Sequence, residues 1–432
     1  MEPRTRRSDV RPRAGGAVVT RPLHGVLVAD FSRVLAGPSC TMTLADLGAT
    51  VIKVERPGAG DDTRSWGPPW SATSSMYFES VNRTKRSVTL DLDDPADLPL
   101  ARELARRADV LVENFRPGAL DRRGLGYAQV AAANPGVVYC TITGFGPGAG
   151  AGLLGYDFIV QAVGGLMSVT GAADGEPTKV GVALVDVLTG KDAAIGILAA
   201  LAARASTGRG CRVEVNLLSS LLAALVNQAQ GYLETGVPPG RMGNRHPSIA
   251  PYETLRCRDG MLAVACGNDG QFARLTRVLG DPGLATDERF ATNAARVANR
   301  EELVAALEGL LAAADAAEWQ ERLTAEQVPA GCVADIAEAF GLAERLGLTP
   351  AVRPRPDRAP QVRHPVSYSE DLVRPAEPPP ALGEHDAAVR AWLASAGGSI
   401  ADLDPVDPAT PPSVDASGAR GEVPRTGGVR GA

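Results

Sequence analysis

Short apolar runs alternate with helical patterns through the first half of the chain. The runs have the length of buried strands and occupy residues 25–31, 50–55, 109–115 and 137–143. A helical segment precedes the later runs, and a Gly/Pro turn follows each of them. Strands that alternate with helices are typical of βαβ units and a mostly parallel sheet. The pattern therefore predicts a doubly wound α/β region.

The pattern continues beyond this region and then changes character. The longest helical pattern spans residues 187–206 and ends at Thr207-Gly208, and a strand-like run at 211–217 leads into an apolar helix that ends near residue 232. A polar, Gly/Pro-rich stretch at 236–251 reads as a linker. Residues 252–332 then combine two strand-like runs with several Ala/Leu helices, which indicates a smaller α/β domain. An extended connection at 349–380 and a short helix near 386–394 follow.

Both ends of the chain lack this periodicity. Residues 1–22 are rich in arginine, and residues 397–432 are rich in Pro, Gly, Asp and Ser. Such composition cannot bury enough apolar surface to offset chain entropy. We therefore expect two disordered tails around an ordered part that begins at Leu23.

Charge and composition exclude several classes of protein. The net charge of −6 argues against a nucleic-acid protein, which needs a basic surface. No apolar stretch approaches the roughly 20 residues that cross a bilayer, and the N-terminal residues lack the apolar core of a secretory signal, so no membrane contact is expected. The six scattered cysteines contain no C-x-x-C pair and the four histidines show no ligand spacing. The chain is thus expected to be cytoplasmic, with reduced thiols and no metal site.

One motif resembles a dinucleotide fingerprint. Gly150-Ala-Gly152-Leu-Leu-Gly155 fits G-x-G-x-x-G, but it lies in a Gly/Ala/Pro run and does not open a helix directly after a strand. We interpret it as a loop. Neither a P-loop nor a G-x-S-x-G serine elbow occurs.

Asp186 is the first candidate for chemistry. It follows the apolar run K-V-G-V-A-L-V and precedes the long helical pattern. Two interpretations stay open: the side chain caps the helix, or it is a nucleophile that the helix N-terminus keeps ionised.

Basic residues follow the predicted strands. Arg56 comes after the run at 50–55, and Lys85 and Arg86 come after V-N-R-T. A third group follows the run V-L-V-E-N-F and consists of Arg116, Arg122 and Arg123. Ligands of α/β sheets bind beyond the carboxyl ends of the strands, and arginine suits phosphate. The grouping indicates a phosphate-bearing ligand, although each residue alone also fits a solvated surface charge.

Several blocks of sequence occur in an order that resembles a known family. They include V-L-V-A-D-F-S-R-V-L-A-G-P, L-G-A-T-V-I-K-V-E-R-P-G-A-G-D, A-D-V-L-V-E-N-F-R-P-G-A-L-D-R-R-G-L-G, G-Y-D-F-I-V-Q-A and A-L-G-E-H. Together they resemble the class III CoA-transferases, or CaiB/BaiF family, whose members include formyl-CoA and carnitine CoA-transferases and α-methylacyl-CoA racemases. The resemblance extends from about Leu23 to Ala394.

The resemblance implies an architecture that periodicity does not give. It implies a Rossmann-like large domain at residues 23–235, completed by about 345–396, and a linker and small domain at 236–344. It also implies a homodimer whose two subunits interlock.

The resemblance also implies a site. The catalytic aspartate of the family falls on Asp186, and CoA binds as a substrate, with no permanently bound cofactor. The implied CoA contacts are Leu35, Ala36, Arg56, Met76, Tyr77, Phe78, Glu79, Asn114, Phe115, Arg116, Arg122, Arg123, Thr143, Gly144, Phe145 and Gly146. The implied reaction moves CoA from an acyl-CoA donor to a carboxylic acid through an aspartyl anhydride and an aspartyl-CoA thioester, without ATP.

Two positions favour a transferase over a racemase of the same family. The racemases carry a histidine before the aspartate of the G-x-D block and a glutamate before the cysteine of the P-Y-E-T-L-R-C block, where this chain has Tyr156 and Arg256. A tyrosine, with an ordinary pKa near 10, replaces a proton-shuttling histidine poorly. Arg256 could pair with an acceptor dicarboxylate, or it could lie at a surface or in a dimer contact.

The sequence also bears on the choice of acceptor acid and on two rival functions. The stretch 236–251 lacks the Gly-rich loop of the formyl-CoA branch, so succinyl-type or other medium-sized acids are expected rather than oxalate. The rivals are an NAD-dependent oxidoreductase that uses the Gly150 to Gly155 run and a silent CoA-binding protein. Retention of Asp186 argues against the silent protein.

Overall fold

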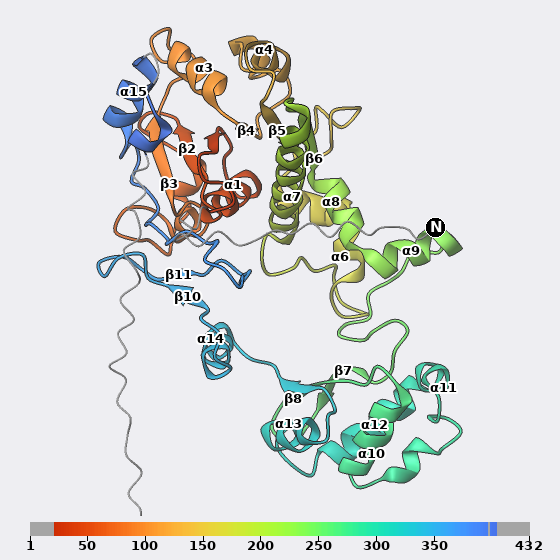
Figure 1. Cartoon of the computed structure of the whole chain (residues 1–432). Helices are drawn as coiled ribbons and strands as arrows, with labels where there is room; N and C mark the ends of the chain where they lie inside the picture. The colour runs from red at the N-terminus through yellow and green to blue at the C-terminus, as the bar shows by residue number, and fades with distance from the viewer. Residues whose placement is uncertain (1–20, 396–397, 404–432) are drawn as a thin grey trace, which may run out of the picture.

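Six parallel strands form the sheet on which the first half of the chain is built. The computed structural model describes residues 21–395 and 398–403. In sheet order the strands are β3 (Lys85–Thr89), β2 (Thr50–Glu55), β1 (Leu27–Asp30), β4 (Val110–Glu113), β5 (Val138–Thr143) and β6 (Arg212–Asn216) (Figure 1). Every neighbouring pair is parallel, which confirms the parallel α/β prediction. The order reverses between β1 and β4, and doubly wound sheets bind ligands at that point.

Five of these strands lie inside the predicted runs, and β3 was missed. Lys85 and Arg86 were predicted to lie in a loop, but they begin this strand. Lys85 is buried, and its Nζ donates to Asp30 Oδ2 (3.0 Å), Asn82 Oδ1 (2.9 Å) and the Pro38 carbonyl oxygen (2.9 Å). The start of this strand is therefore buried by an ion pair and not by apolar side chains, so it lacks the apolar pattern on which the prediction depended.

Helices cover both faces of the sheet (Figure 1). One core joins the sheet to α1 (Ala36–Asp46), α5 (Asp157–Val163), α7 (Leu184–Thr207) and α8 (Leu217–Ala224). The other core joins it to α3 (Leu98–Arg107), α4 (Tyr127–Ala133) and α15 (Asp386–Ala394). Successive strand residues alternate between the two cores, as the pleat requires: Leu27 faces one and Val28 the other. The region is therefore a three-layer α/β sandwich.

A second body has its own core and lies apart in Figure 1. Its antiparallel sheet contains β7 (Tyr252–Arg256), β8 (Met261–Ala265) and β9 (Ala330–Cys332). Its helices are α10 (Asp269–Val278), α11 (Asn293–Ala298), α12 (Arg300–Leu311) and α13 (Ala316–Ala325). The remaining α-helices and strands of the described residues are α2 (Met76–Glu79), α6 (Leu166–Val169), α9 (Val226–Thr235), α14 (Ile336–Arg345), β10 (Ala351–Val352) and β11 (Gln361–Val362).

The end of the chain returns to the large sheet. Helix α15 has the bounds expected from the sequence and packs against α3 and β3. Residues 398–403 were predicted to belong to the tail, but residues 400–402 form a 3-10 helix, and Leu403 is buried in the core beside α15. Arg21 and Pro22 were also predicted to belong to the N-terminal tail, but they are ordered: the Arg21 carbonyl oxygen accepts a hydrogen bond from the His24 N–H (3.0 Å), and the Arg21 side chain packs against Gly48. The remaining predicted tail residues, 1–20, 397 and 404–432, lie outside the described residues. Among the helices that are described, none combines the length and apolarity that a membrane crossing requires.

Candidate active site

A cavity of about 790 Å³ opens at the carboxyl ends of the central strands. Loops that follow β1, β2, β4 and β5 form its walls, and Asp186 reaches it from the first turn of α7. It brings together the following predicted residues: Leu35, Ala36, Arg56, Asn114, Phe115, Arg116, Thr143, Gly144, Phe145, Gly146 and Asp186. Segments more than a hundred residues apart in sequence thus meet at the reversal point of the sheet.

Other predicted residues line two smaller cavities. Tyr77 lines one of about 230 Å³, and Asp186 lines it too. Arg123 lines one of about 130 Å³ together with Arg56, and its guanidinium pairs with Asp93 at 2.6 Å. Asp186 therefore stands between the large cavity and the cavity of Tyr77.

Four predicted contacts line none of these three cavities: Met76, Phe78, Glu79 and Arg122. Phe78 is fully buried, with the Arg64 guanidinium 3.7 Å from its ring centre. Glu79 is also buried and accepts a hydrogen bond from Ser71 at 2.6 Å. Phe78 and Glu79 are thus buried away from these cavities, whereas Arg122 is exposed.

Asp186 does not cap α7, contrary to one of the two interpretations from the sequence. It is the third residue of the helix, after the N-cap residue Ala183. The capping carboxylate belongs to Asp157 at the start of α5, whose Oδ1 accepts from the backbone N–H of Val185 (2.7 Å) and of Asp186 (3.3 Å). Gln161 holds the other Asp157 oxygen at 2.6 Å. The Asp186 side chain is therefore spared from capping, and Asp157 is a site residue that sequence reasoning missed.

Burial and charge together set the proton affinity of Asp186. Burial, together with the nearby charge of Asp157, raises its pKa to about 7. The expectation that the helix terminus keeps this carboxylate fully ionised is thus not met, because desolvation disfavours the charged form. Near neutral pH, Asp186 is poised between its acid and its carboxylate.

A close helix contact places Asp186 at this position. Gly190, one turn further along α7, packs against the start of α1, where an added Cβ would lie 2.6 Å from the Ala36 carbonyl oxygen. Only glycine permits that approach without a shift of the backbone. The first turn of α1 consequently packs against the second turn of α7, beside the cavity that Ala36 and Asp186 line.

Three arginines line the large cavity: Arg33, Arg56 and Arg116. Arg33 was missed, although it directly follows the first strand and the same loop rule that selected Arg56 applies to it. Its guanidinium lies 5.2 Å from the Phe115 ring centre, and its Nη1 lies 3.3 Å from Asp62 Oδ2. Asp62 also pairs with Arg56. The cluster suits an anion that carries several charges.

The Gly-rich run forms part of the same cavity and does not open a helix. Gly155 lies against Gly144 of the turn after β5, where an added Cβ on Gly144 would be 2.6 Å from the Gly155 Cα. Helix α5 begins only at Asp157, after Tyr156. The glycines therefore serve a close approach between two loops.

Arg256 was considered either a partner for an acceptor dicarboxylate or a surface or dimer residue. Arg256 lies exposed on β7 of the second body, where its backbone N–H donates to Glu308 (2.8 Å), and it lines none of the cavities described above. In the part of the chain that is described, no group of three or more His, Cys, Asp or Glu side chains is arranged to hold a metal ion.

Comparisons with known proteins agree with this geometry. Residues 23–386 match the family described as CoA-transferase family III. The chain is 43% identical over 394 residues to a succinate–glutarate CoA-transferase of Agrobacterium fabrum, covering 86% of this chain and 96% of that protein. It is 42% identical over 377 residues to an acetyl-CoA:oxalate CoA-transferase of Acetobacter aceti, covering 87% and 96%. The crystal structure of a CaiB/BaiF family protein from Brucella suis superimposes with a TM-score of 0.78 at 45% identity, covering 86% of this chain and 99% of that one. The chain therefore belongs to CoA-transferase family III, the CaiB/BaiF family.

Proposed function

We propose that the protein transfers CoA from a dicarboxylic acyl-CoA to a second dicarboxylic acid, with Asp186 as the nucleophile. The observation that carries the proposal is the place of this carboxylate, buried between a large cavity rich in arginine and a smaller one. A carboxylate that borders both binding spaces can take over the CoA of a thioester bound in one and give it to an acid bound in the other.

The large cavity has the chemistry that CoA requires. Its volume of about 790 Å³ lies within the range of cavities that enclose ligands of this size. Arg33, Arg56 and Arg116 supply cations for phosphates. The adjoining cavity of about 130 Å³ adds the apolar side chains of Leu90 and Phe115, which suit a flat base. These features support the binding of CoA with its thioester directed toward Asp186.

The reaction we propose proceeds through two acyl exchanges on Asp186. The carboxylate attacks the thioester carbonyl, the C–S bond breaks, and an anhydride and CoA thiolate form. The thiolate attacks the aspartyl carbonyl, which releases the donor acid and leaves an aspartyl-CoA thioester. The acceptor carboxylate attacks this thioester, forming a new anhydride and freeing the thiolate again. Attack of that thiolate on the acceptor acyl carbon gives the new thioester and restores Asp186.

The smaller cavity supports a dicarboxylic acceptor. Trp66, Tyr77, Tyr156 and Phe158 are among its lining residues, and Lys179 is the cation among them. A dicarboxylic acid could present one carboxylate to Asp186 and the other to the Lys179 ammonium. The two relatives named for glutarate and for oxalate both act on dicarboxylic acids by name. Oxalate, not expected from the sequence, therefore joins succinate and glutarate as a candidate.

The role of Lys179 gives a direct test of acceptor choice. We expect Lys179→Gln to raise KM for glutarate by roughly 10- to 100-fold, since a charge-assisted contact of about 1.5–3 kcal/mol is lost. The KM for butyrate, which has no second carboxylate, should stay unchanged. Initial rates with succinyl-CoA as donor measure both. Equal effects on the two acids would contradict the assignment.

A screen tests the function itself. Purified protein is incubated with succinyl-CoA, acetyl-CoA or 2-methylacyl-CoA and a panel of acids that includes glutarate and oxalate, and the new thioesters are read by mass spectrometry. We expect transfer from succinyl-CoA to glutarate. Solvent deuterium at the α carbon of 2-methylacyl-CoA, without transfer, would instead indicate a racemase, which Tyr156 disfavours. NADH added in place of CoA should not protect against thermal unfolding, and protection would favour the oxidoreductase.

We further propose that two chains interlock as a cytoplasmic homodimer. Exposed apolar side chains on α9, α14 and the following turn include Leu233, Ile336, Leu346 and Leu348, at 61–80% exposure. Two connecting segments hold the second body away from the large sheet (Figure 1), leaving room for another subunit. All six cysteines are free thiols, as a reducing compartment requires. Sedimentation of the purified chain tests the dimer.

A further inference from the structure

The turn after β1 adopts a backbone conformation that its sequence disfavours. Val34 has φ +72°, in the left-handed region that β-branched residues rarely enter. Val34 lines both the large cavity and the smaller cavity, the two spaces between which Asp186 stands. Such a conformation persists only where the surroundings hold it, and it is common at functional sites.

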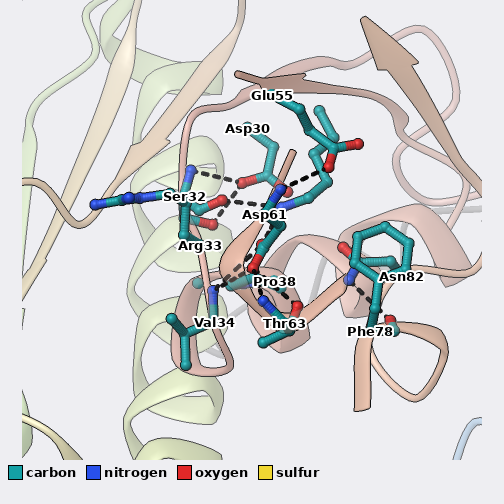
Figure 2. Close-up of polar contacts among 12 residues, drawn as sticks. Asp30, Ser32, Arg33, Val34, Pro38, Glu55, Asp61, Thr63, Phe78 and Asn82 are labelled. Carbon is teal, nitrogen blue, oxygen red and sulfur yellow. Dashed lines mark hydrogen bonds and ion pairs between the residues drawn. The ribbon is translucent and has the colours of Figure 1, made fainter. Parts of the chain in front are cut away.

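Hydrogen bonds hold this turn on each side. The Val34 N–H donates to both oxygens of Asp61, at 3.2 and 3.3 Å. The neighbouring Arg33 exchanges two hydrogen bonds with Asn114 from the loop after β4, N–H to Oδ1 at 3.0 Å and C=O from Nδ2 at 2.8 Å. Figure 2 shows Asp61 between Val34 and Thr63 on one side and Glu55 on the other.

Asp61 is itself fixed by a buried cation. Lys53 Nζ lies 2.9 Å from Asp61 Oδ2 and 3.0 Å from the Ser32 carbonyl oxygen, and both charged side chains are fully buried. Thr63 adds two donors to Asp61 Oδ1, at 2.8 and 3.0 Å. Burial alone would raise the pKa of Asp61, but Lys53 and these hydrogen bonds lower it to about 2. The carboxylate is therefore charged and immobile beneath the turn.

We propose that Asp61 is a positioning residue for the transfer reaction: with Lys53, it holds Val34 in the left-handed conformation and so fixes the wall that faces Asp186. The inference rests on the proposed function, because the wall matters for chemistry only if Asp186 reacts. Asp61 and Lys53 line the cavity of about 130 Å³ that is proposed to hold the base, but Asp61 lines neither of the cavities that Asp186 lines. Its effect on kcat therefore passes through the backbone of Val34, whereas a lost contact with the base would raise KM for the acyl-CoA. Displacement of a site wall by about 1 Å lowers rates by about 100-fold.

A double-mutant cycle tests the inference. We expect Asp61→Asn to lower kcat for succinyl-CoA and glutarate by about 100-fold. In the Val34→Gly background the same substitution should cost about tenfold or less, because glycine keeps a positive φ without the clamp. An equal loss in both backgrounds would overturn the proposal, as would no loss in either.

A matched control separates positioning from general destabilisation. Asp46 is also buried in an ion pair, with Arg83 and His364, but it lies at the far end of α1. Asp46→Asn should lower the melting temperature, while kcat changes less than about threefold and is insensitive to Val34→Gly. A loss of kcat in Asp46→Asn equal to that in Asp61→Asn would show that destabilisation alone explains the effect.

Two further measurements keep the result decisive. If Asp61→Asn does not fold, Asn114→Ala releases Arg33 from the other side of the turn and enters the same cycle. If the unsubstituted chain transfers no CoA, the proposed function fails by itself, and hydrogen exchange of the Val34 amide then reports the clamp. We expect faster exchange in Asp61→Asn, and unchanged exchange would refute the clamp.

Discussion

Asp186→Ala is expected to lower the rate of CoA transfer by at least about 1,000-fold, because the proposed anhydride and aspartyl-CoA thioester both form on this carboxylate. The dissociation constant for CoA should stay within a few-fold of the original, since the arginines and loops of the large cavity are unchanged. Initial rates by mass spectrometry give the first quantity, and isothermal titration with CoA gives the second. A covalent adduct trapped with hydroxylamine after addition of succinyl-CoA should disappear in the variant.

The same helix supplies a control for this substitution. Asp192 lies six residues after Asp186 on α7 and is exposed. Asp192→Asn removes an equal charge from α7 and should retain full activity and the trapped adduct. Transfer that survives Asp186→Ala would mean that the nucleophile lies elsewhere, and transfer absent from all forms, with CoA still bound, would favour the silent CoA-binding protein.

The parallel sheet could be predicted from the sequence because its strands are apolar. β2 was predicted with its observed bounds, and four more strands lie inside apolar runs. β3 escaped because Lys85 at its start is buried by pairing with Asp30 and not by apolarity. Hydrophobic patterning cannot reveal a buried charge whose partner lies 55 residues away.

Some residues of the site could likewise be predicted from the sequence and others could not. The resemblance led to Asp186 and to ten more of the 24 residues that line the large cavity. The roles of Asp157 and Asp61 depend on contacts between segments that are distant in the sequence. Asp157 of α5 accepts hydrogen bonds from the start of α7, and Asp61, in the segment after β2, accepts them from the turn after β1. A rule about loops after strands could have found Arg33, whereas no local signal in the sequence marks Val34 as left-handed.

The acid limb of the pH profile should follow Asp186, since only its carboxylate form can attack a thioester. With a pKa of about 7, raised by burial and then by Asp157, the reactive fraction is about one half at pH 7. Protonation lowers the carboxylate fraction about tenfold for each further pH unit, so kcat/KM, which follows the free enzyme, should be about 50-fold lower at pH 5 than at pH 7. Initial rates between pH 5 and 9, with circular dichroism as a check on folding, measure the limb.

The cause of the raised pKa can be tested through Asp157. The amide of Asp157→Asn still offers an oxygen to the Val185 N–H, so the start of α7 keeps its cap, but the negative charge beside Asp186 is lost. Because a like charge disfavours ionisation, its removal should lower the pKa of Asp186 and shift the acid limb to lower pH. Asp192→Asn, on the same helix, should leave the limb in place. If the acid limb stays near pH 7 in Asp157→Asn, burial alone raises the pKa of Asp186. If substitution of neither Asp157 nor Asp186 changes the limb, the titrating group lies outside this pair.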